Sequence, residues 1–169
     1  MNGYFLLRPS VYGQMGIKTE WDRTVSPPQV SSLHFVLDCD PLDDLHKSSP
    51  CFLVSRTLAE RIAKDGFTGA TIEGVLAEYD KQYLEREPDA VKPDLRLLRP
   101  TGKAGSADFG LNEERQLVVS ERAMSLLKQF RISNCRVYDD TSTTFAQMKV
   151  DTLAEIRKSL DKARAAKRR

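Results

Sequence analysis

Two segments of the chain share one order of hydrophobic and polar positions. Residues 52–62 read FLVSRTLAERI, and residues 117–127 read LVVSERAMSLL. In each segment a short apolar run is followed by a serine and then by apolar residues at helical spacing. This order predicts a strand that leads directly into a helix, capped by Ser55 in the first segment and by Ser120 in the second.

A strand-like run follows each of these helices, at residues 70–75 and 135–138. The sequence therefore predicts two similar strand–helix–strand units, at about residues 51–75 and 116–139. Short strand–helix joins also look alike by chance, so duplication and coincidence both remain open on the sequence alone.

Apolar runs bounded by turn residues also predict strands at residues 4–8, 33–37 and 95–99, and the strand after the first helix extends over residues 71–77. Residues 11–30 hold two glycines and two prolines and indicate a long surface loop that contains Trp21. A short helical turn opened by Asp40 is expected over residues 41–45, and a short helix or a solvated connection over residues 78–92. We therefore expect an α+β protein of a single domain, with a mixed or antiparallel sheet, two or three helices and a C-terminal helix.

The C-terminal helix is expected over residues 151–166, where Thr152 and Glu155 match the capping box. Its apolar stripe, which we expect to pack on the body, consists of Leu153, Ile156, Leu160 and Ala163. Charge separates this region from the rest. Residues 149–169 carry eight Lys or Arg and three Asp or Glu, a net charge of +5, whereas residues 1–148 carry 18 and 21, a net charge of −3. The chain is thus divided into an α+β body, residues 1–148, and a basic helical extension, residues 149–169.

The composition, 40% hydrophobic and 30% charged, is typical of a soluble globular protein. No run approaches the ~20 apolar residues of a membrane-spanning helix, and the start MNGYFLLRPS lacks the basic n-region of a secretory signal. We therefore expect a cytoplasmic protein without membrane contact. The three cysteines, Cys39, Cys51 and Cys135, form no CxxC pair, which favours free thiols over a disulfide framework or a zinc site.

The densest polar cluster is an acidic run that consists of Asp38, Asp40, Asp43 and Asp44. It lacks the ligand spacing and the terminal glutamate of a calcium loop, so a metal site is the least favoured interpretation. A helix cap with an acidic surface and a docking patch for a basic partner are the other two. His34 and His46 lie near the run in sequence, and they are the only histidines available for acid–base chemistry.

No other motif indicates catalysis or a cofactor. The glycine-rich stretch TGKAGSADFG at residues 101–110 lacks the Walker spacing and predicts a plain turn. Neither Ser55 nor Ser120 lies in a G-x-S-x-G elbow. The chain is therefore expected to have no cofactor, no metal and no enzymatic activity.

Three segments carry a resemblance to a known family. They are YFLLRPSVYGQMG at residues 4–16, SPCFLVSRTLAERIAKDGFTGATI at residues 49–72, and the runs LRLLRPTGKAGSADFGL and LVVSERAMSLLKQF between residues 95 and 130. They resemble the cytoplasmic immunity proteins of bacterial polymorphic toxin systems, over about residues 3–139. The resemblance implies an α+β body that binds and neutralises one cognate toxin domain. It transfers no toxin-contacting residue and does not extend to the C-terminal helix.

We therefore expect a non-enzymatic binder of a cognate toxin domain. Its partner contacts are expected from the early loop and the acidic run, at Tyr12, Trp21, Asp38, Asp40, Asp43 and Asp44. Tryptophan is enriched in interface hot spots, and acidic charge suits a basic toxin. Two alternatives stay open. One is a nucleic-acid-associated accessory protein that uses the basic C-terminal helix, and the other is a small enzyme with an Asp/His site near residues 34–46.

Overall fold

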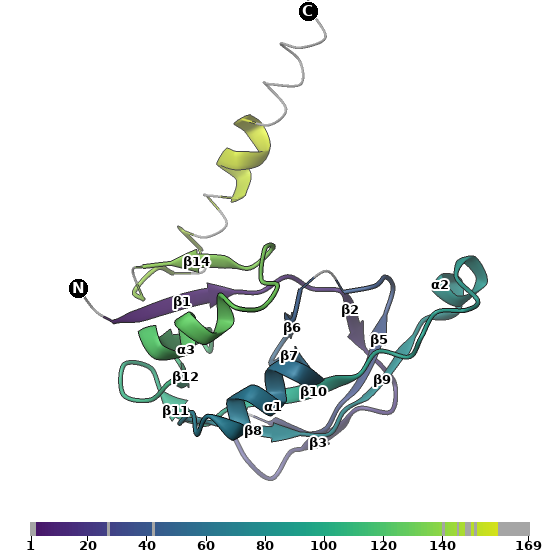
Figure 1. Ribbon diagram of the computed structural model, residues 1–169, viewed down its shortest axis with the longest axis horizontal. Coiled ribbons are helices and arrows are strands. Elements are labelled where there is room, and N and C mark those ends of the chain that lie inside the picture. The colour runs from purple at the N-terminus through teal and green to yellow at the C-terminus, as the bar shows by residue number, and fades with distance from the viewer. Residues whose placement is uncertain are drawn as a thin grey trace, which may run out of the picture.

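The computed structural model has an α+β architecture that is richer in strand than the sequence predicts. It describes residues 3–26, 28–41, 43–139, 141–144, 146–147, 150 and 152–158. Within these residues the strands form four sheets rather than one, with short helices packed around them (Figure 1). No helix in the described part of the chain is long and apolar enough to cross a membrane.

The strands are β1 (Tyr4–Arg8), β2 (Gly13–Met15), β3 (Glu20–Asp22), β4 (Gln29–Ser32), β5 (His34–Leu37), β6 (Leu45–Ser48), β7 (Cys51–Ser55), β8 (Ala70–Glu73), β9 (Leu76–Tyr79), β10 (Leu95–Pro100), β11 (Gly102–Lys103), β12 (Phe109–Leu111), β13 (Leu117–Ser120) and β14 (Arg136–Tyr138). The helices are α1 (Arg56–Lys64), α2 (Lys81–Arg86) and α3 (Glu121–Leu127), and residues 152–158 are also helical.

One arrangement of four strands occurs twice. The order β6-β7-β10-β8 in one sheet matches the order β12-β13-β1-β14 in the five-stranded sheet, whose other edge strand is β11. In both arrangements the second strand leads straight into a helix, α1 after β7 and α3 after β13. The strand pairs within both arrangements are all antiparallel.

The strand registers agree as closely as the strand orders. Leu95 at the start of β10 pairs with Ser55, and Tyr4 at the start of β1 pairs with Ser120. The two strands also share a sequence, because residues 6–9 and residues 97–100 both read LLRP. Agreement in order, register and sequence favours duplication over coincidence as the origin of the two units.

Each unit completes its sheet with a strand that belongs, by sequence order, to the other. Along the chain β1 precedes β6, β7, α1 and β8, and β10 precedes β12, β13, α3 and β14. In space, however, β1 lies between β13 and β14, and β10 lies between β7 and β8. The two copies have therefore exchanged their first strands, and neither has a complete sheet by itself.

Two aspartates at equivalent places reinforce this exchange. Asp108 and Asp44 come directly before β12 and β6, the first hairpin strand of each unit. Asp108 Oδ2 accepts the backbone N–H of Thr68 at 2.9 Å, and Asp44 Oδ2 accepts that of Arg131 at 2.8 Å. Thr68 follows α1 and Arg131 follows α3, so each unit holds the loop that follows the helix of the other.

Ser55 and Ser120 cap α1 and α3, as the sequence predicts. Ser55 Oγ accepts the N–H of Leu58 at 3.4 Å, and Ser120 Oγ accepts the N–H of Ala123 at 3.1 Å. The second hydrogen bond of each serine differs, because the Ser120 hydroxyl donates to Asp108 Oδ1 at 2.6 Å whereas the Ser55 hydroxyl contacts the exposed Thr57 Oγ1 at 3.2 Å.

The Asp108 carboxylate accepts two more hydrogen bonds, from the Thr68 hydroxyl at 3.1 Å and from Arg122 Nη1 at 2.9 Å. Burial alone would raise the pKa of this carboxyl group. Hydrogen bonds from Ser120 and Thr68, together with the charge of Arg122, nevertheless hold the pKa below its usual range. The ionised form of Asp108 is therefore the one that stabilises the fold.

One hydrophobic core joins the two units, and equivalent positions meet in it. Leu7 and Leu98, the second leucines of the two LLRP sequences, both lie in this core with Val54 and Val119. The first leucines point to the opposite faces of their sheets, because side chains alternate along a strand. Leu97 packs there in a second apolar cluster, which includes Leu33, Phe35 and Leu37.

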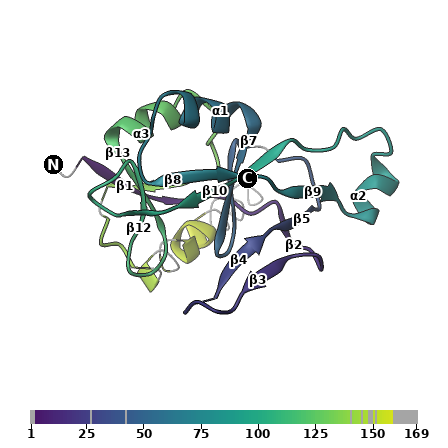
Figure 2. The same ribbon diagram turned by 90° about the horizontal axis from the view of Figure 1, so that it is seen from below.

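Two stretches between the repeated strands come together in one lobe, seen with β2, β5, β9 and α2 on the right of Figure 1. Residues 11–43 lie between β1 and β6, and residues 74–94 lie between β8 and β10. In this lobe β5 pairs in parallel with β9, and β2 completes a three-stranded sheet. The hairpin of β3 and β4 lies beside that sheet (Figure 2). We call residues 11–43 and 74–94 the insertion lobe.

The prediction of a long loop over residues 11–30 is wrong, because β2, β3 and the start of β4 lie within these residues. Each of these strands has only three or four residues, too few for an alternating pattern to stand out in the sequence. The strand predicted over residues 71–77 is instead divided between β8 and β9, which belong to different sheets.

The helical turn predicted over residues 41–45 is also wrong. Residues 43–44 form a bend, and β6 begins at Leu45. The polar groups of Asp43 and Asp44 bind the chain at residues 131–134 rather than a helix start. This long-range pairing takes precedence over the local capping tendency of aspartate.

The C-terminal helix contacts the body through polar side chains. Arg136 donates to Thr152 Oγ1 at 2.8 Å and to Glu155 Oε2 at 2.6 Å. Leu153 and Ile156 are 66% and 51% exposed, so the expected packing of the apolar stripe on the body is wrong for these two residues. The other members of the stripe, Leu160 and Ala163, lie outside the described residues.

Replacing Ser120 with alanine should destabilise the protein more than replacing Ser55 with alanine. Both changes remove a helix cap, at a cost of about 0.5–2 kcal/mol. Only Ser120→Ala also removes a donor from the buried Asp108 carboxylate, which adds about 1–3 kcal/mol. Urea unfolding of the two variants measures the difference. Equal losses, or a larger loss in Ser55→Ala, would contradict the role assigned to the Ser120–Asp108 bond.

The advantage of wild type over Asp108→Asn should depend on pH. The folded-state pKa of Asp108 lies below the unfolded value of about 3.9, so the carboxylate stabilises fully above that value. Its contribution is lost as the pH falls through the folded-state pKa. Unfolding free energies should therefore differ near neutral pH and converge below about pH 4. Asp89→Asn, at an exposed site, is the control and should show no such gap. A wild-type advantage that stays constant to about pH 2 would rule this account out.

Candidate functional site

The insertion lobe concentrates the acidic charge of the body. Residues 11–43 and 74–94 together carry five Lys or Arg and eleven Asp or Glu, a net charge of −6. The rest of residues 1–148 carries thirteen and ten, a net charge of +3. The two insertions are separate in the sequence but form one lobe in the fold. Their acidic residues therefore come together on one part of the protein.

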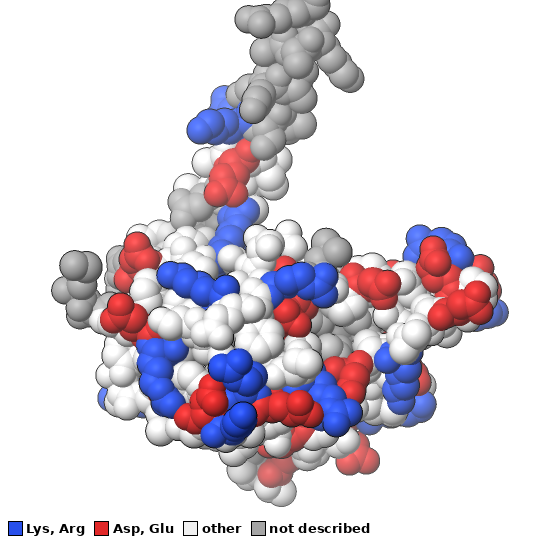
Figure 3. All heavy atoms as spheres, viewed as in Figure 1, with Lys and Arg blue, Asp and Glu red and all other residues white. Residues whose placement is uncertain are grey.

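The duplicated body presents a different kind of surface. On the face viewed in Figure 3, acidic and basic side chains alternate along α1. Arg56 pairs with Glu60 at 2.7 Å, and Arg61 pairs with Asp65 at 3.1 Å, both at helical i,i+4 spacing. Charges on this helix are therefore largely balanced within the chain, and such exposed pairs contribute little to recognition.

The β3–β4 hairpin adds exposed apolar side chains to the lobe. Trp21 in β3 is 40% exposed, and Ile17, just before this strand, is 99% exposed. Val25, in the connection between β3 and β4, is 38% exposed. A partly anchored tryptophan beside exposed aliphatic residues is typical of a protein-binding surface.

The acidic run divides into two pairs with different environments. Asp38 and Asp40 are exposed, and Asp40 accepts a hydrogen bond from the Tyr79 hydroxyl. Burial raises the pKa of Tyr79, and its contact with Asp40 raises it further, so the phenol remains a donor at neutral pH. The Tyr79 ring in turn packs on Tyr83 of α2 with ring centroids 4.5 Å apart. Asp38 and Asp40 thus lie at the surface, and Asp40 lies beside an aromatic pair.

Asp43 and Asp44 instead bind the body. Asp43 is 3% exposed and accepts two hydrogen bonds from Asn134, from its backbone N–H at 2.9 Å and from Nδ2 at 3.2 Å. Asp44 holds the backbone of Arg131. Tyr12, the other candidate contact residue of the early loop, is buried with its ring edge-on to His46. In this conformation Tyr12, Asp43 and Asp44 support the fold, and Trp21, Asp38 and Asp40 face the solvent.

The two histidines occupy separate buried places. His34 in β5 accepts the backbone N–H of Lys18 on Nδ1 at 3.3 Å, and its Nε2 donates to Glu78 Oε1 at 2.7 Å. The His34 hydrogen bond holds the pKa of Glu78 below its usual range. His46 in β6 is fully enclosed, and neither ring nitrogen has a hydrogen-bond partner in the described structure. Burial lowers the pKa of His46, so the ring is neutral at pH 7.

The cysteines are free thiols, as the sequence predicts. Burial raises the pKa of Cys51 to about 11 and that of Cys135 to about 12. Both thiols are therefore protonated at neutral pH, whereas a nucleophile or a metal ligand would need the thiolate. Among the described residues, no group of three His, Cys, Asp or Glu side chains could hold a metal ion.

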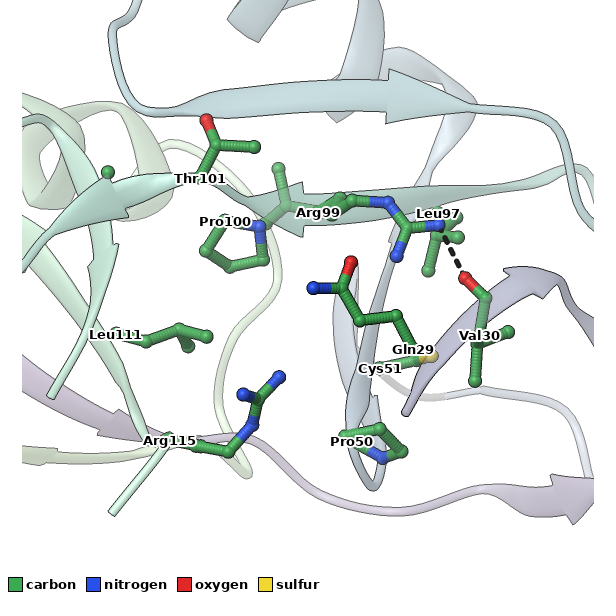
Figure 4. Close-up of a pocket in the computed structure, with 12 residues that line it drawn as sticks. Gln29, Val30, Pro50, Cys51, Leu97, Arg99, Pro100, Thr101, Leu111 and Arg115 are labelled. Atoms are coloured by element: carbon green, nitrogen blue, oxygen red, sulfur yellow. Dashed lines mark hydrogen bonds between the residues drawn. The ribbon is translucent and has the colours of Figure 1, made fainter. Parts of the chain in front are cut away.

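A cavity of about 330 Å³ lies where the lobe meets the body (Figure 4). Gln29 and Val30 of β4 line one side, and Arg115 in the β12–β13 turn lines another. Arg99 binds Glu73 through two hydrogen bonds, at 2.7 and 2.8 Å, and its Nη2 also donates to the carbonyl of Val30 at 2.9 Å. This set of contacts fastens the β3–β4 hairpin to the duplicated body.

The Arg115 backbone is unusual, with a φ of 57° in the left-handed region that non-glycine residues rarely adopt. In Figure 4 the side chains of Arg115 and Gln29 extend into the cavity. The cavity thus combines a guanidinium and an amide group with apolar walls. This cavity borders the exposed hairpin and extends the candidate surface.

Sequence reasoning missed the Arg99–Glu73 link, the exposure of Ile17, and the exchange of β1 with β10. A signal for the exchange was present in the recurrence of LLRP at residues 6–9 and 97–100. Ile17 lies in the turn between β2 and β3, with Gly16 and Thr19 close by in sequence, and gave no periodic signal. Its exposure follows from the β2–β3 connection, which only the tertiary structure defines.

A scan against models of known protein families finds no match for this chain, and a search of curated proteins finds no significant relative. The surfaces and side-chain contacts of the chain itself are therefore the basis for its function.

Replacing Asp43 with asparagine should destabilise the fold, whereas replacing Asp38 with asparagine should not. Asp43→Asn weakens two hydrogen bonds at a buried site, which costs about 1–3 kcal/mol. Asp38 is exposed, and surface substitutions stay within about 0.5 kcal/mol. Chemical unfolding of the matched pair gives the comparison. Indistinguishable stabilities would show that Asp43 does not anchor residues 131–134.

Proposed function

We propose that this chain is a cytoplasmic immunity protein, which binds a cognate toxin domain and neutralises it without catalysis. The observation that carries this proposal is the insertion lobe, in which two stretches of sequence combine a net charge of −6 with an exposed tryptophan. The resemblance of residues 3–139 to such immunity proteins is in agreement with it.

The first insertion is longer than the crossing that it makes. It belongs to the connection between β1 and β6, which spans residues 9–44, whereas the equivalent connection between β10 and β12 spans only residues 101–108. Part of the lobe covers the outer face of the sheet at Leu97. The rest is exposed to solvent, and its acidic composition and exposed apolar side chains support partner binding.

Electrostatics favours a basic partner. A surface of one sign attracts an oppositely charged protein over several ångströms and speeds encounter, most strongly at low salt. Toxin domains that act on nucleic acids or nucleotides present basic clefts for their substrates. A lobe with exposed Asp38 and Asp40 can occupy such a cleft and exclude the substrate.

Apolar contacts supply affinity after encounter. Trp21, Ile17 and Val25 expose hydrophobic area on and beside one hairpin, and burying about 100 Å² of such area contributes about 2.5 kcal/mol before the costs of association. The hairpin is held by the Arg99–Val30 bond, so less ordering is needed on binding. The protonated thiols and enclosed histidines are compatible with a protein that blocks rather than reacts.

The direct test is to establish whether the neighbouring upstream gene encodes a toxin-like C-terminal domain and, where it does, to co-express this chain with that domain. The proposal expects restored growth of the host and a complex of the two proteins that survives gel filtration. Full toxin activity in the presence of an excess of this folded protein would contradict the proposal.

Reversing the exposed acidic pair should slow association. Asp38→Lys with Asp40→Lys changes the charge of the lobe by +4, which should lower the association rate by about tenfold or more at low salt and flatten its salt dependence. The control, Glu113→Lys with Asp139→Lys, makes the same change of charge at exposed sites outside the lobe. Stopped-flow association across a salt series measures both. Equal rates for the two double variants would exclude Asp38 and Asp40 from the binding surface.

A further inference from the structure

His46 lies where the insertion lobe joins the duplicated body. Its ring is fully enclosed, and neither ring nitrogen has a hydrogen-bond partner in the described structure. Nearly all buried polar groups in proteins are hydrogen-bonded, so this unsatisfied ring needs an explanation. We propose that His46 is an acid-sensitive latch, which as a neutral ring lets both ends of residues 11–43 close on the body and as a cation releases them. The latch is a property of the fold and does not depend on toxin binding.

Both ends of the first insertion meet at this ring. Tyr12 is the second residue of the insertion, and its ring stands edge-on to His46 with the ring centroids 5.3 Å apart. Asp43 is the last residue of the insertion, and it is buried close enough to His46 for its charge to act on the ring. The point at which residues 11–43 leave the body and the point at which they rejoin it are therefore both next to His46.

The ring faces the lobe rather than the common core. His46 of β6 pairs with Leu53 of β7, and directly opposite residues of antiparallel strands point to the same face. Leu53 packs in the apolar cluster that holds Phe35 and Leu37 of β5 in the lobe. Leu45, the residue before His46, lies in the common core on the other face. A charge on His46 would therefore enter the junction between lobe and body.

Two carboxylates act on the ring, those of Asp43 and Asp44. Both favour its protonated form, as does the backbone of Asp43, but burial outweighs them and lowers the pKa of His46. A histidine in the unfolded chain has a pKa of about 6.5. The free energy of unfolding is therefore unaffected by His46 above about pH 6.5. It falls below that pH, because the unfolded chain takes up a proton that the folded ring does not.

The other titratable groups that the structure places near the ring stay neutral in this range. Burial raises the pKa of the Tyr12 phenol and of the Cys39 and Cys135 thiols. β2, which packs against β6, carries no titratable residue, and Lys47 points to the other face of β6. The response of this junction between pH 5 and 7 thus depends on His46.

Asp43 supplies the alternative arrangement. In the closed junction it accepts the backbone N–H of Asn134 at 2.9 Å and the Asn134 Nδ2 at 3.2 Å. A protonated ring carries an N–H donor on each nitrogen and competes with Asn134 for this carboxylate. Loss of the Asn134 bonds frees the end of the insertion from residues 131–134. Proton uptake at one buried ring then opens the junction.

Three measurements on the full-length protein between pH 7.5 and 5 test the latch. In NMR the ring of His46 is one of only two histidine signals, and its contact with the Tyr12 ring identifies it. We expect its titration midpoint below pH 6.5. In urea unfolding, the unfolding constant of wild type should rise relative to that of His46→Phe by up to about tenfold per pH unit below about pH 6.5. Hydrogen–deuterium exchange, corrected for intrinsic rates, should show more opening of residues 11–15 and 43–46 at pH 5 than at pH 7 in wild type only.

Tyr12→Phe is the matched control, because it keeps the ring against His46 and removes only a buried hydroxyl without a partner. This variant should retain the wild-type pH dependence. The same pH dependence in wild type and His46→Phe would overturn the proposal, and so would a His46 midpoint at or above pH 6.5. Acid-induced exchange that leaves residues 11–15 and 43–46 unchanged would also overturn it. If His46→Phe does not fold, the titration and exchange of wild type decide. None of these results bears on the toxin test, which is made at neutral pH with the latch closed.

Discussion

The antiparallel pairing of β1 with β13, and of β10 with β7, is the constraint on which the rest of the structure depends. Each of these ladders joins parts of the chain about 40 to over 100 residues apart and places the first strand of one copy in the middle of the sheet of the other. The common core forms only when both pairings are made, because Leu7 and Leu98 enter it from the exchanged strands. Asp44 and Asp108 then fix the loops that follow the two helices.

The two units differ in what surrounds their equivalent strands. The outer face of one sheet, at Leu97, is covered by the insertion lobe, whereas the equivalent Leu6 packs with residues such as Tyr138. Arg99 and Glu73 form an ion pair, but Arg8 shares a cavity with Lys47. One scaffold thus carries two different surroundings of the same LLRP sequence. The acidic lobe covers one of these two surroundings, and a cavity lined by Arg8 and Lys47 borders the other.

Features set by local interactions could be predicted from the sequence. The caps at Ser55 and Ser120 depend on residues within one turn, and the pattern around them identified both helices. The strands of the lobe could not be predicted, because β2, β3 and β4 are short and their register is set by partners elsewhere in the chain. The recurrence of LLRP indicates related strands, but no local rule shows that β1 and β10 change places.

The candidate site was predictable only in part for the same reason. Asp38, Asp40, Asp43 and Asp44 look alike in sequence, and only the approach of residues 131–134 distinguishes Asp43 and Asp44, which bind those residues, from the exposed Asp38 and Asp40. Tyr12 and Trp21 are both aromatic residues of the early segment. Tyr12 is nevertheless buried against His46, whereas Trp21 is partly exposed on the β3–β4 hairpin. Similarly, the stripe of the C-terminal helix predicted a packed face, but Arg8 and Arg136 hold this helix through Thr152 and Glu155.

The central claim is that the insertion lobe, and not the duplicated body, is the surface that binds the toxin. Hydrogen–deuterium exchange of the chain, alone and in complex with the toxin domain, tests this claim most directly. The account predicts slower exchange in the complex at residues 17–25 and 36–40, with little change at α1 and α3. Protection confined to α1 and α3, with unchanged exchange in the lobe, would contradict it.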